Sequence, residues 1–296
     1  MTLHAFTLII AAGIIHAFWN IVAKKAGGDA RFSLFTSVLN ALVWLPVGWW
    51  VGKDVVPLWG TTEWAFVSAS ALLHIFYFVT LLRGYRVADL TVVYPLARGS
   101  GPLISSMVAV LFLGEHLSSL GAVGIAAVVA GVFLIAGGPA MLRAATRPGP
   151  GEARDRTIKG LYYGLLTGLF IAAYTVVDSY AVKVLLLSPI LLDYMGNLVR
   201  VVMLAPLGVM NWGETRRLWL QQWRFALVVA IFSPMAYVLV LYAVQTAPIS
   251  HVAPAREVSM LFAALIGGKL LGEGDRLLRI AGALLIGVGV VALGLG

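Results

Sequence analysis

One stretch of about fifty residues occurs twice in this chain, and the repeat constrains the fold more than any other feature. The first copy runs from Tyr85 to Leu134, and the second begins at Tyr242. A shift of 158 positions brings the matching residues into register: Arg98 on Arg256, Leu113-Gly114-Glu115 on Leu271-Gly272-Glu273, Gly124 on Gly282 and Gly131 on Gly289. An apolar composition produces leucine and glycine matches by chance, but it does not supply the arginine and glutamate matches. A repeat whose period is half the chain predicts two related structural halves.

The composition places the chain in a membrane. Of its 296 residues, 60% are hydrophobic and 11% are charged, whereas a soluble domain carries about 25% charged residues. A membrane-spanning helix needs about 20 mainly apolar residues. Ten segments meet this requirement: 5–23, 32–51, 63–82, 90–113, 119–138, 160–180, 189–210, 225–245, 249–271 and 277–295. Within lipid every backbone N–H and C=O must be satisfied inside the segment, so we expect helices and not strands.

The distribution of lysine and arginine predicts the orientation. Fourteen of them lie in the connections that follow the first, third, fifth, seventh and ninth segments, and Arg279 at the start of the last segment makes fifteen, whereas the other connections hold Lys53 and Lys183. Cytoplasmic loops carry the excess of positive charge, so the basic connections are expected inside and both termini outside. Each half holds five segments, an odd number, so the second half runs upside down relative to the first.

The expected fold class is therefore all-α integral membrane, with ten transmembrane helices as two inverted five-helix repeats around a central cavity. The expected parts are the first repeat (1–138), a cytoplasmic linker (139–159) and the second, inverted repeat (160–296). Inverted repeats of this kind recur in secondary transporters, whose substrate site lies at the repeat interface.

Missing residues and motifs exclude several function classes. The sequence has no cysteine, which excludes disulfides and thiolate chemistry. It has no H-E-x-x-H, G-x-S-x-G or P-loop motif, and His16, His74 and His251 lack metal-ligand spacing. The net charge of +8 is explained by cytoplasmic loops and not by a nucleic-acid-binding face. We therefore expect a protein that is not an enzyme, that binds no nucleic acid, and that needs no cofactor or metal.

With these features, the chain resembles the EamA-type members of the drug/metabolite transporter superfamily. The resemblance rests on Pro95, Pro102 and the L-G-E motif of the first half, and on the second L-G-E motif at 271–273. The aromatic-rich third and fourth helices resemble those of bacterial amino-acid exporters, notably the aromatic amino-acid exporters. The resemblance implies a multi-pass protein of the bacterial cytoplasmic (inner) membrane that works by alternating access. One departure is Met260 at the position that matches Pro102, so the ninth helix is expected to bend differently from the fourth.

Ionisable residues inside predicted spans are costly and indicate function. Arg98 and Arg256 are related by the repeat, and a guanidinium can hold a carboxylate through two parallel hydrogen bonds. The alternative is a structural pairing of each arginine with Asp193, Glu257 or free helix carbonyls. For Arg200 we favour this structural pairing.

Aromatic and polar residues supply a second set of candidates. Rings can sandwich an apolar side chain and attract an ammonium group, and the residues expected to bind substrate with the two arginines are Trp19, Asn20, His74, Tyr77, Tyr94 and Tyr174. Other tryptophans near predicted span ends are interpreted as an interfacial belt: Trp44, Trp49, Trp50, Trp59, Trp64, Trp212, Trp219 and Trp223. The spaced glycines at 160, 164 and 168 and at 282 and 289 are interpreted as helix-packing positions. Pro95, Pro102 and Pro254 are expected to loosen their helices and expose carbonyls.

The leading functional hypothesis is export of amino acids, aromatic or large apolar ones, through a lipid bilayer. An alternative is exchange of phosphorylated or nucleotide-linked metabolites, and a different class is a membrane enzyme or scaffold. Candidates for proton coupling are Asp178, Asp193 and Glu257. The oligomeric state and the substrate stay open at this point.

Overall fold

The computed structural model describes residues 1–296 except 89, 136–137, 139–150 and 268–275. The described residues form α-helices, one short 3₁₀ helix and no strand. The helices are α1 (Leu3–Ala26), α2 (Ala30–Val43), α3 (Leu45–Gly52), η1 (Val56–Leu58), α4 (Thr61–Val87), α5 (Leu90–Phe112), α6 (Ser119–Ile135), α8 (Gly151–Lys183), α9 (Pro189–Val209), α10 (Trp212–Thr246), α11 (Ile249–Ala255), α12 (Val258–Gly267) and α13 (Arg276–Leu295). The described part of each expected apolar segment falls on one helix or on two consecutive helices.

By length and composition, the described helices supply fewer spans than the ten expected. Seven are long and apolar enough to cross a membrane: α1, α4, α5, α8, α9, α10 and α13. The pair α2 and α3, bent by 57°, makes an eighth if it counts as one span. α6 has 17 residues, and the ninth expected segment is divided into α11 and α12, with 7 and 10 residues. The second L-G-E motif and Lys269 lie outside the described residues.

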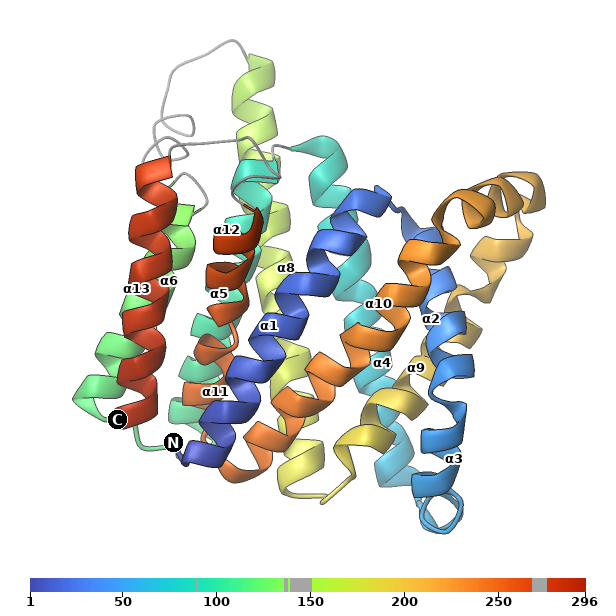
Figure 1. Cartoon of the computed structure of the whole chain (residues 1–296), viewed down its shortest axis with the longest axis horizontal. Helices are drawn as coiled ribbons and strands as arrows, with labels where there is room; N and C mark the ends of the chain where they lie inside the picture. Colours follow the sequence, from blue (N-terminus) through green and yellow to red (C-terminus); the bar gives the residue numbers. More distant parts are fainter. Residues whose placement is uncertain (89, 136–137, 139–150, 268–275) are drawn as a thin grey trace.

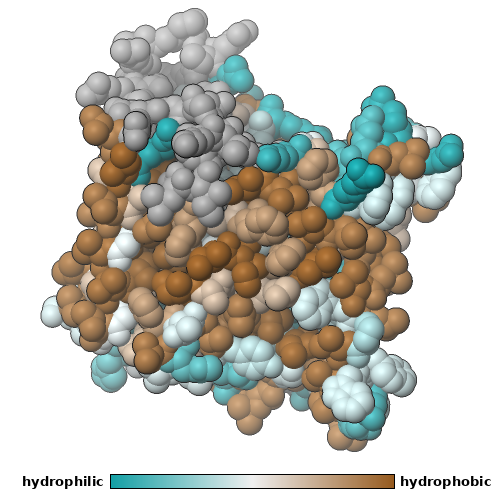
Figure 2. Space-filling view, viewed as in Figure 1, coloured by the Kyte–Doolittle hydropathy of each residue, from teal (hydrophilic) through white to brown (hydrophobic). Residues whose placement is uncertain are grey.

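The surface carries the apolar belt that a bilayer requires. Figure 2 shows hydrophobic residues across the middle of the molecule and hydrophilic ones toward its two ends. Trp49, Trp50 and Trp212 are exposed, at 68%, 75% and 68%, as an interfacial belt requires. Two other tryptophans pack between helices instead. Trp44 Nε1 donates to a carbonyl of α10 at 3.1 Å, and the ring of Trp219 lies edge-on to an α2 phenylalanine at 5.3 Å. The belt interpretation is wrong for these two, because the kink of α2 and the length of α10 place their rings inside the bundle.

α6 and α13, the last helices of the two halves, pack through their glycines. A Cβ on Gly131 would lie 2.5 Å from the carbonyl oxygen of Gly282, and one on Gly124 would lie 2.9 Å from that of Gly289. The contacting glycines have increasing residue numbers along α6 and decreasing ones along α13, so the two helices are antiparallel (Figure 1). The repeat matches Gly124 with Gly282 and Gly131 with Gly289, so the two contacts exchange when the halves are exchanged. The packing interpretation of these glycines is confirmed.

A second pair of contacts exchanges in the same way. A Cβ on Gly13 of α1 would collide with Val258 of α12, and one on Gly168 of α8 would collide with Ser100 of α5. The shift of 158 relates Ser100 to Val258. In the first helix of each half, a shift of 155 positions matches Trp19 with Tyr174 and relates Gly13 to Gly168. Small residues thus bring the first helix of each half against the fourth helix of the other half.

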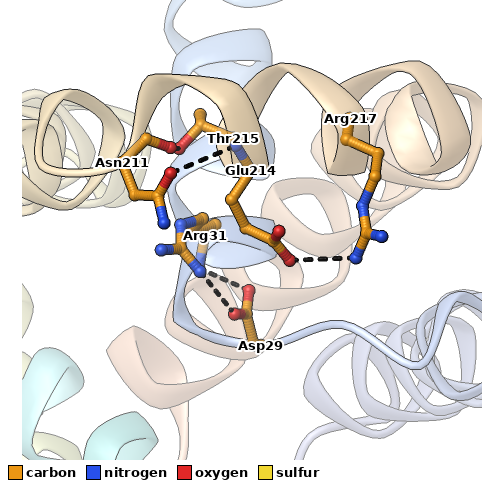
Figure 3. Close-up of polar contacts among 6 residues, drawn as sticks. All are labelled: Asp29, Arg31, Asn211, Glu214, Thr215 and Arg217. Atoms are coloured by element: carbon orange, nitrogen blue, oxygen red, sulfur yellow. Dashed lines mark hydrogen bonds and ion pairs between the residues drawn. The ribbon is translucent and has the colours of Figure 1, made fainter.

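Two helices begin earlier than expected. α8 starts at Gly151, inside the expected linker 139–159. α10 starts at Trp212, where Asn211 Oδ1 accepts from the Glu214 backbone N–H at 3.3 Å. Figure 3 shows this cap beside Asp29 of the α2 start. These basic helix starts lie at the end of the bundle opposite the two chain termini (Figure 1).

The prolines act differently in the two halves. α5 continues as a helix through Pro95 and Pro102, so the two prolines do not interrupt it. α8 packs along α5 and supports it, as neighbouring helices do for prolines in membranes. The ninth span is broken directly after Pro254, and its backbone crosses the break by i→i+3 bonds, such as Glu257 N to Pro254 O at 3.0 Å. The different bend expected from Met260 in place of Pro102 agrees with this break.

Candidate functional site

The break between α11 and α12 places three charged residues together inside the bundle. Arg98 Nη2 of α5 lies 2.8 Å from Glu257 Oε2 and donates to Ser259 Oγ at 3.1 Å. Arg256 Nε lies 3.7 Å from Glu257 Oε1. The Glu257 side chain is 1% exposed, so one buried carboxylate serves the two repeat-related arginines.

Arg256 retains unused hydrogen-bonding capacity. Its side chain is 10% exposed, and its Nε and Nη2 have no hydrogen-bond partner among the described residues. Its guanidinium carbon lies 5.8 Å from the ring centre of Tyr174. Buried polar groups are normally satisfied, so this guanidinium is well placed to bind an anionic group beside an aromatic ring.

Four rings from three helices form a cluster next to Arg256. Tyr174 of α8 stacks on His74 of α4, with centroids 4.1 Å apart and an interplanar angle of 25°. Tyr77 meets Tyr174 at 5.8 Å and 67°. Tyr237 of α10 lies 5.5 Å from His74 and 6.4 Å from Tyr174, edge-on to both. We call these four residues the ring cluster. Such edge-to-face arrangements are the favoured geometries of aromatic pairs.

A small cavity adjoins the ring cluster. It has a volume of about 90 Å³ and is lined by residues of α2, α4 and α9, including Ser33, His74, Tyr77 and Arg200. Since a water molecule occupies about 30 Å³ in the liquid, this space holds a few waters and no whole amino acid. A larger ligand would require movement of the helices around it.

A second ion pair lies beside this cavity. Arg200 Nη2 is 3.5 Å from Asp193 Oδ1, and both belong to α9. Their side chains are 22% and 10% exposed. The structural pairing favoured for Arg200 is present.

The other candidates lie around this centre or away from it. Trp19 packs with α2 and α10 against Phe32, and its ring meets that of His16 edge-on at 5.3 Å. Asn20 Nδ2 donates to the His16 carbonyl of its own helix at 2.7 Å. Tyr94 lies four residues before Arg98, one helical turn away on α5. The structure therefore brings together Arg98, Arg256, His74, Tyr77 and Tyr174, with Tyr94 one turn from Arg98, whereas Trp19 packs with α2 and α10.

Sequence reasoning did not select Tyr237 or Ser259. Tyr237 completes the ring cluster, and its hydroxyl donates to Asp178 Oδ2. A polar aromatic residue three positions after Pro234 in an apolar helix was the available signal. Ser259 lies three residues from Arg256, but no spacing rule connects it with Arg98 on another helix.

The first L-G-E motif connects the two halves at the end of the bundle that carries both termini. Glu115 Oε1 accepts from the Ile249 backbone N–H at 2.8 Å, and Oε2 accepts from Ser250 N at 2.9 Å and Ser250 Oγ at 2.8 Å. Lys183 Nζ lies 3.6 Å from Glu115 Oε1. Burial acts to raise the pKa of the Glu115 carboxyl, but the hydrogen bonds from Ser250 and Ile249 and the Lys183 charge outweigh it and lower this pKa. We call this contact the Glu115 latch, because a residue of the first half caps a helix of the second.

Comparisons with known proteins agree with the two halves. The model of the EamA-like transporter family matches the chain twice, over residues 4–137 and 158–295. A solved structure described as "Crystal structure of protein" is 13% identical, with a TM-score of 0.73 over 98% of this chain and 96% of that chain. At this identity the likeness shows the fold alone. No curated protein matches the sequence. Since the two family matches span nearly the whole chain and its apolar helices can cross a bilayer, the protein belongs to the EamA-like transporter family and is a multi-pass membrane transporter of the drug/metabolite transporter superfamily.

Proposed function

We propose that this transporter exports amino acids, aromatic or large apolar ones, across a bacterial cytoplasmic membrane by alternating access. The observation that carries the proposal is the guanidinium of Arg256, which has free donors and lies 5.8 Å from Tyr174 of the ring cluster. A carboxylate bound to this guanidinium would hold the attached side chain beside the rings.

The charge of the site favours a monoanionic group over a phosphate. Arg98 and Arg256 contribute two positive charges, and Glu257 contributes one negative charge. A carboxylate bound at Arg256 supplies a second negative charge for the two arginines, and the ammonium group of the amino acid would lie against the rings of the ring cluster. A phosphate monoester carries about −1.5 to −2 charges at pH 7, so it would leave the buried site with excess negative charge.

The ring cluster supports selectivity for the side chain. A well-placed aromatic pair contributes about 0.5–1.5 kcal/mol beyond simple burial, which corresponds to roughly two- to twelve-fold in affinity per pair. Tyr77 and Tyr174 are expected to make such pairs with a substrate ring. Trp19 would influence substrate binding indirectly, by positioning the ring of His16, which it contacts edge-on at 5.3 Å.

The proposed architecture is ten spans in two inverted repeats. The exchanging contacts of Gly124, Gly131, Gly13 and Gly168 support it, because a two-fold axis between antiparallel α6 and α13 produces such exchange. The small volume of the cavity supports alternating access, since a substrate could bind only after the helices move. The basic helix ends opposite the termini support a cytoplasmic linker and outside termini.

Flux measurements in proteoliposomes test the proposal. Labelled phenylalanine, its amide, alanine and a sugar phosphate are compared in counterflow with the purified protein. We expect phenylalanine to exchange fastest. The Arg256→Gln variant should weaken phenylalanine exchange about tenfold or more. Exchange of phenylalanine amide should change little, because its carboxamide group is uncharged. Arg217→Gln is the matched control, because Arg217 is 66% exposed and pairs with Glu214. Equal loss for acid and amide, or preference for the sugar phosphate, would exclude the proposal.

A further inference from the structure

Three described carboxylates are buried deep in the helix bundle, and one of them has no cation of its own. Glu257 and Asp193 lie 2.8 Å and 3.5 Å from the nearest arginine nitrogen. Asp178 of α8 is 0% exposed, and within the described part of the chain it forms no ion pair. A buried ionised carboxylate without a cation is costly, so the neutral acid is the form that such a position favours.

The contacts of Asp178 suit a group that gains and loses a proton. Tyr237 donates its hydroxyl hydrogen to Asp178 Oδ2, and the hydroxyl of Ser70 faces the same carboxyl group. Asp178 Oδ1 is buried and has no hydrogen-bond partner among the residues that the structure describes. One carboxyl oxygen is thus stabilised and the other is free to carry the proton.

The surrounding charged and titratable groups come from three helices. α10 brings Tyr237, α4 brings His74 through its contact with Ser70, and α9 brings the paired Arg200 and Asp193. Arg200 forms its ion pair with Asp193 and not with Asp178. The arginines of α5 and the α11–α12 break engage Glu257 instead.

Tyr237 connects this acid with the proposed substrate site. Its hydroxyl contacts Asp178, while its ring lies 5.5 Å from His74 and 6.4 Å from Tyr174. A substrate ring that enters this cluster must displace Tyr237 or its neighbours, because the adjoining cavity is only about 90 Å³. Displacement would let water replace the tyrosine hydroxyl at Asp178, and solvation by water stabilises the charged carboxylate.

We infer that Asp178 is a proton-binding site, and that it releases its proton to water when the ring cluster takes up substrate. The O–H bond of the carboxylic acid breaks, the proton passes to water, and the carboxylate takes up a proton again after the substrate leaves. Substrate and proton thus occupy the protein in turn, and they cross the membrane in opposite directions. The inference rests on the proposed transport function and adds its coupling ion.

The first test uses a pH gradient. Labelled phenylalanine should accumulate several-fold in proteoliposomes whose lumen is more acidic than the medium, with the membrane potential clamped. Asp178→Asn should abolish this accumulation and leave counterflow at equal pH within about twofold of wild type. Asp155→Asn is the matched control on the same helix, since Asp155 is exposed, and it should behave as wild type.

The outcomes separate the two proposals. Counterflow without pH-driven accumulation in wild type, or accumulation that survives in Asp178→Asn, would overturn the proton site and leave the transport proposal standing. Accumulation driven by a sodium gradient at equal pH would also overturn it. Absence of counterflow for every compound in the panel would instead refute the proposed amino-acid transport.

Two further measurements keep the inference testable if phenylalanine is not carried or Asp178→Asn does not fold. Infrared spectra of the purified wild type, titrated from pH 8 to pH 5, should show the carbonyl band of a protonated carboxyl group appear, and Asp155→Asn should keep it. Tyr237→Phe retains the ring and removes the hydroxyl donor. In the wild type this donor stabilises the charged form of the Asp178 carboxyl group. The proton affinity should therefore rise about tenfold, moving the infrared titration up by about one pH unit. An absent band, or an unmoved titration, would refute the assignment.

Discussion

The Glu115 latch predicts how one end of the transporter stays closed. Replacing Glu115 by Gln keeps the size of the side chain but removes its charge and leaves one oxygen acceptor. That side chain now accepts three hydrogen bonds, from Ile249 N, Ser250 N and Ser250 Oγ. The amide NH₂ group of glutamine would face at least one of these donors, so one charge-assisted bond is lost.

The contacts of Glu115 determine how much free energy the Glu115→Gln substitution should cost. A hydrogen bond to a charged group contributes about 1.5–3 kcal/mol, and the Glu115 side chain is 15% exposed and therefore partly screened. We take the lower part of that range, about 1.5–2 kcal/mol. This corresponds to a roughly ten- to thirty-fold larger population in which the two halves are separated at this end.

Cysteine labelling measures that population directly. The chain has no native cysteine, so Ser106→Cys provides a single thiol. Ser106 is 2% exposed and donates to the Ser250 carbonyl at 3.2 Å, directly behind the latch. In the Ser106→Cys background, Glu115→Gln should raise the rate of maleimide labelling ten- to thirty-fold. Glu63→Gln is the matched control, because Glu63 accepts from Gly60 N at 2.8 Å within its own segment.

Acid provides a second way to open the latch. The pKa of Glu115 is lowered below its ordinary value of 4.5, since the hydrogen bonds and Lys183 outweigh burial. A lowered pKa means that the stabilisation is complete above the ordinary value and is lost as the pH falls through the folded value. Labelling, normalised to a free thiol, should therefore stay constant from about pH 8 to 5 and rise only below about pH 4. Unchanged labelling in Glu115→Gln, together with a lower thermal stability, would show that Glu115 stabilises the fold without closing a path.

The remaining predictions concern packing, topology and the second ion pair. Gly131→Ala places a methyl group 2.5 Å from a carbonyl oxygen of α13 and should destabilise the protein by about 1–3 kcal/mol, measured by thermal unfolding in detergent; Gly213→Ala, with nothing within 4 Å, is the neutral control, and equal stability of both variants would contradict the packing. A reporter that is active only in the cytoplasm should be silent after Gly296, and activity there would reverse the proposed orientation. Arg200→Gln leaves Asp193 buried without its cation and should cost about 3 kcal/mol. The double variant Arg200→Gln with Asp193→Asn should recover part of the stability that Arg200→Gln loses. If the double variant instead loses the sum of the two single losses, the two residues do not stabilise the protein as a pair.

The positions of the helices could be predicted from the sequence because they depend on local composition. Within the described residues, every expected apolar segment coincides with a helix or a helix pair, since lipid leaves the backbone no other hydrogen-bond partner. The helix starts were less predictable. Asn211 and Gly151 begin helices well before the apolar residues do, because capping and helix propensity continue a helix beyond the hydrocarbon region.

The candidate site was predictable where repeat and charge coincide. Arg98 and Arg256 match in the repeat, and the structure places both beside Glu257. Trp19 and Tyr174 also match in the repeat, yet Trp19 packs against α2 and α10 while Tyr174 joins the ring cluster. Repeat position gives the helix and the depth of a residue, but the neighbouring helices decide which rings meet.

The two halves are related in their packing, but they differ at the site itself. The shift of 158 places Glu257 on Gly99, so the first half offers no counterpart to the carboxylate. Without Glu257, two buried guanidinium groups would repel each other, and this carboxylate holds them together in the absence of a substrate. Arg98 lies on the continuous helix α5 and is also held by Ser259. Arg256 lies at the break between α11 and α12, where the backbone can change direction without moving α5. Arg256 is therefore the arginine expected to shift between conformations, whereas Arg98 keeps its position and fixes the place of the bound carboxylate.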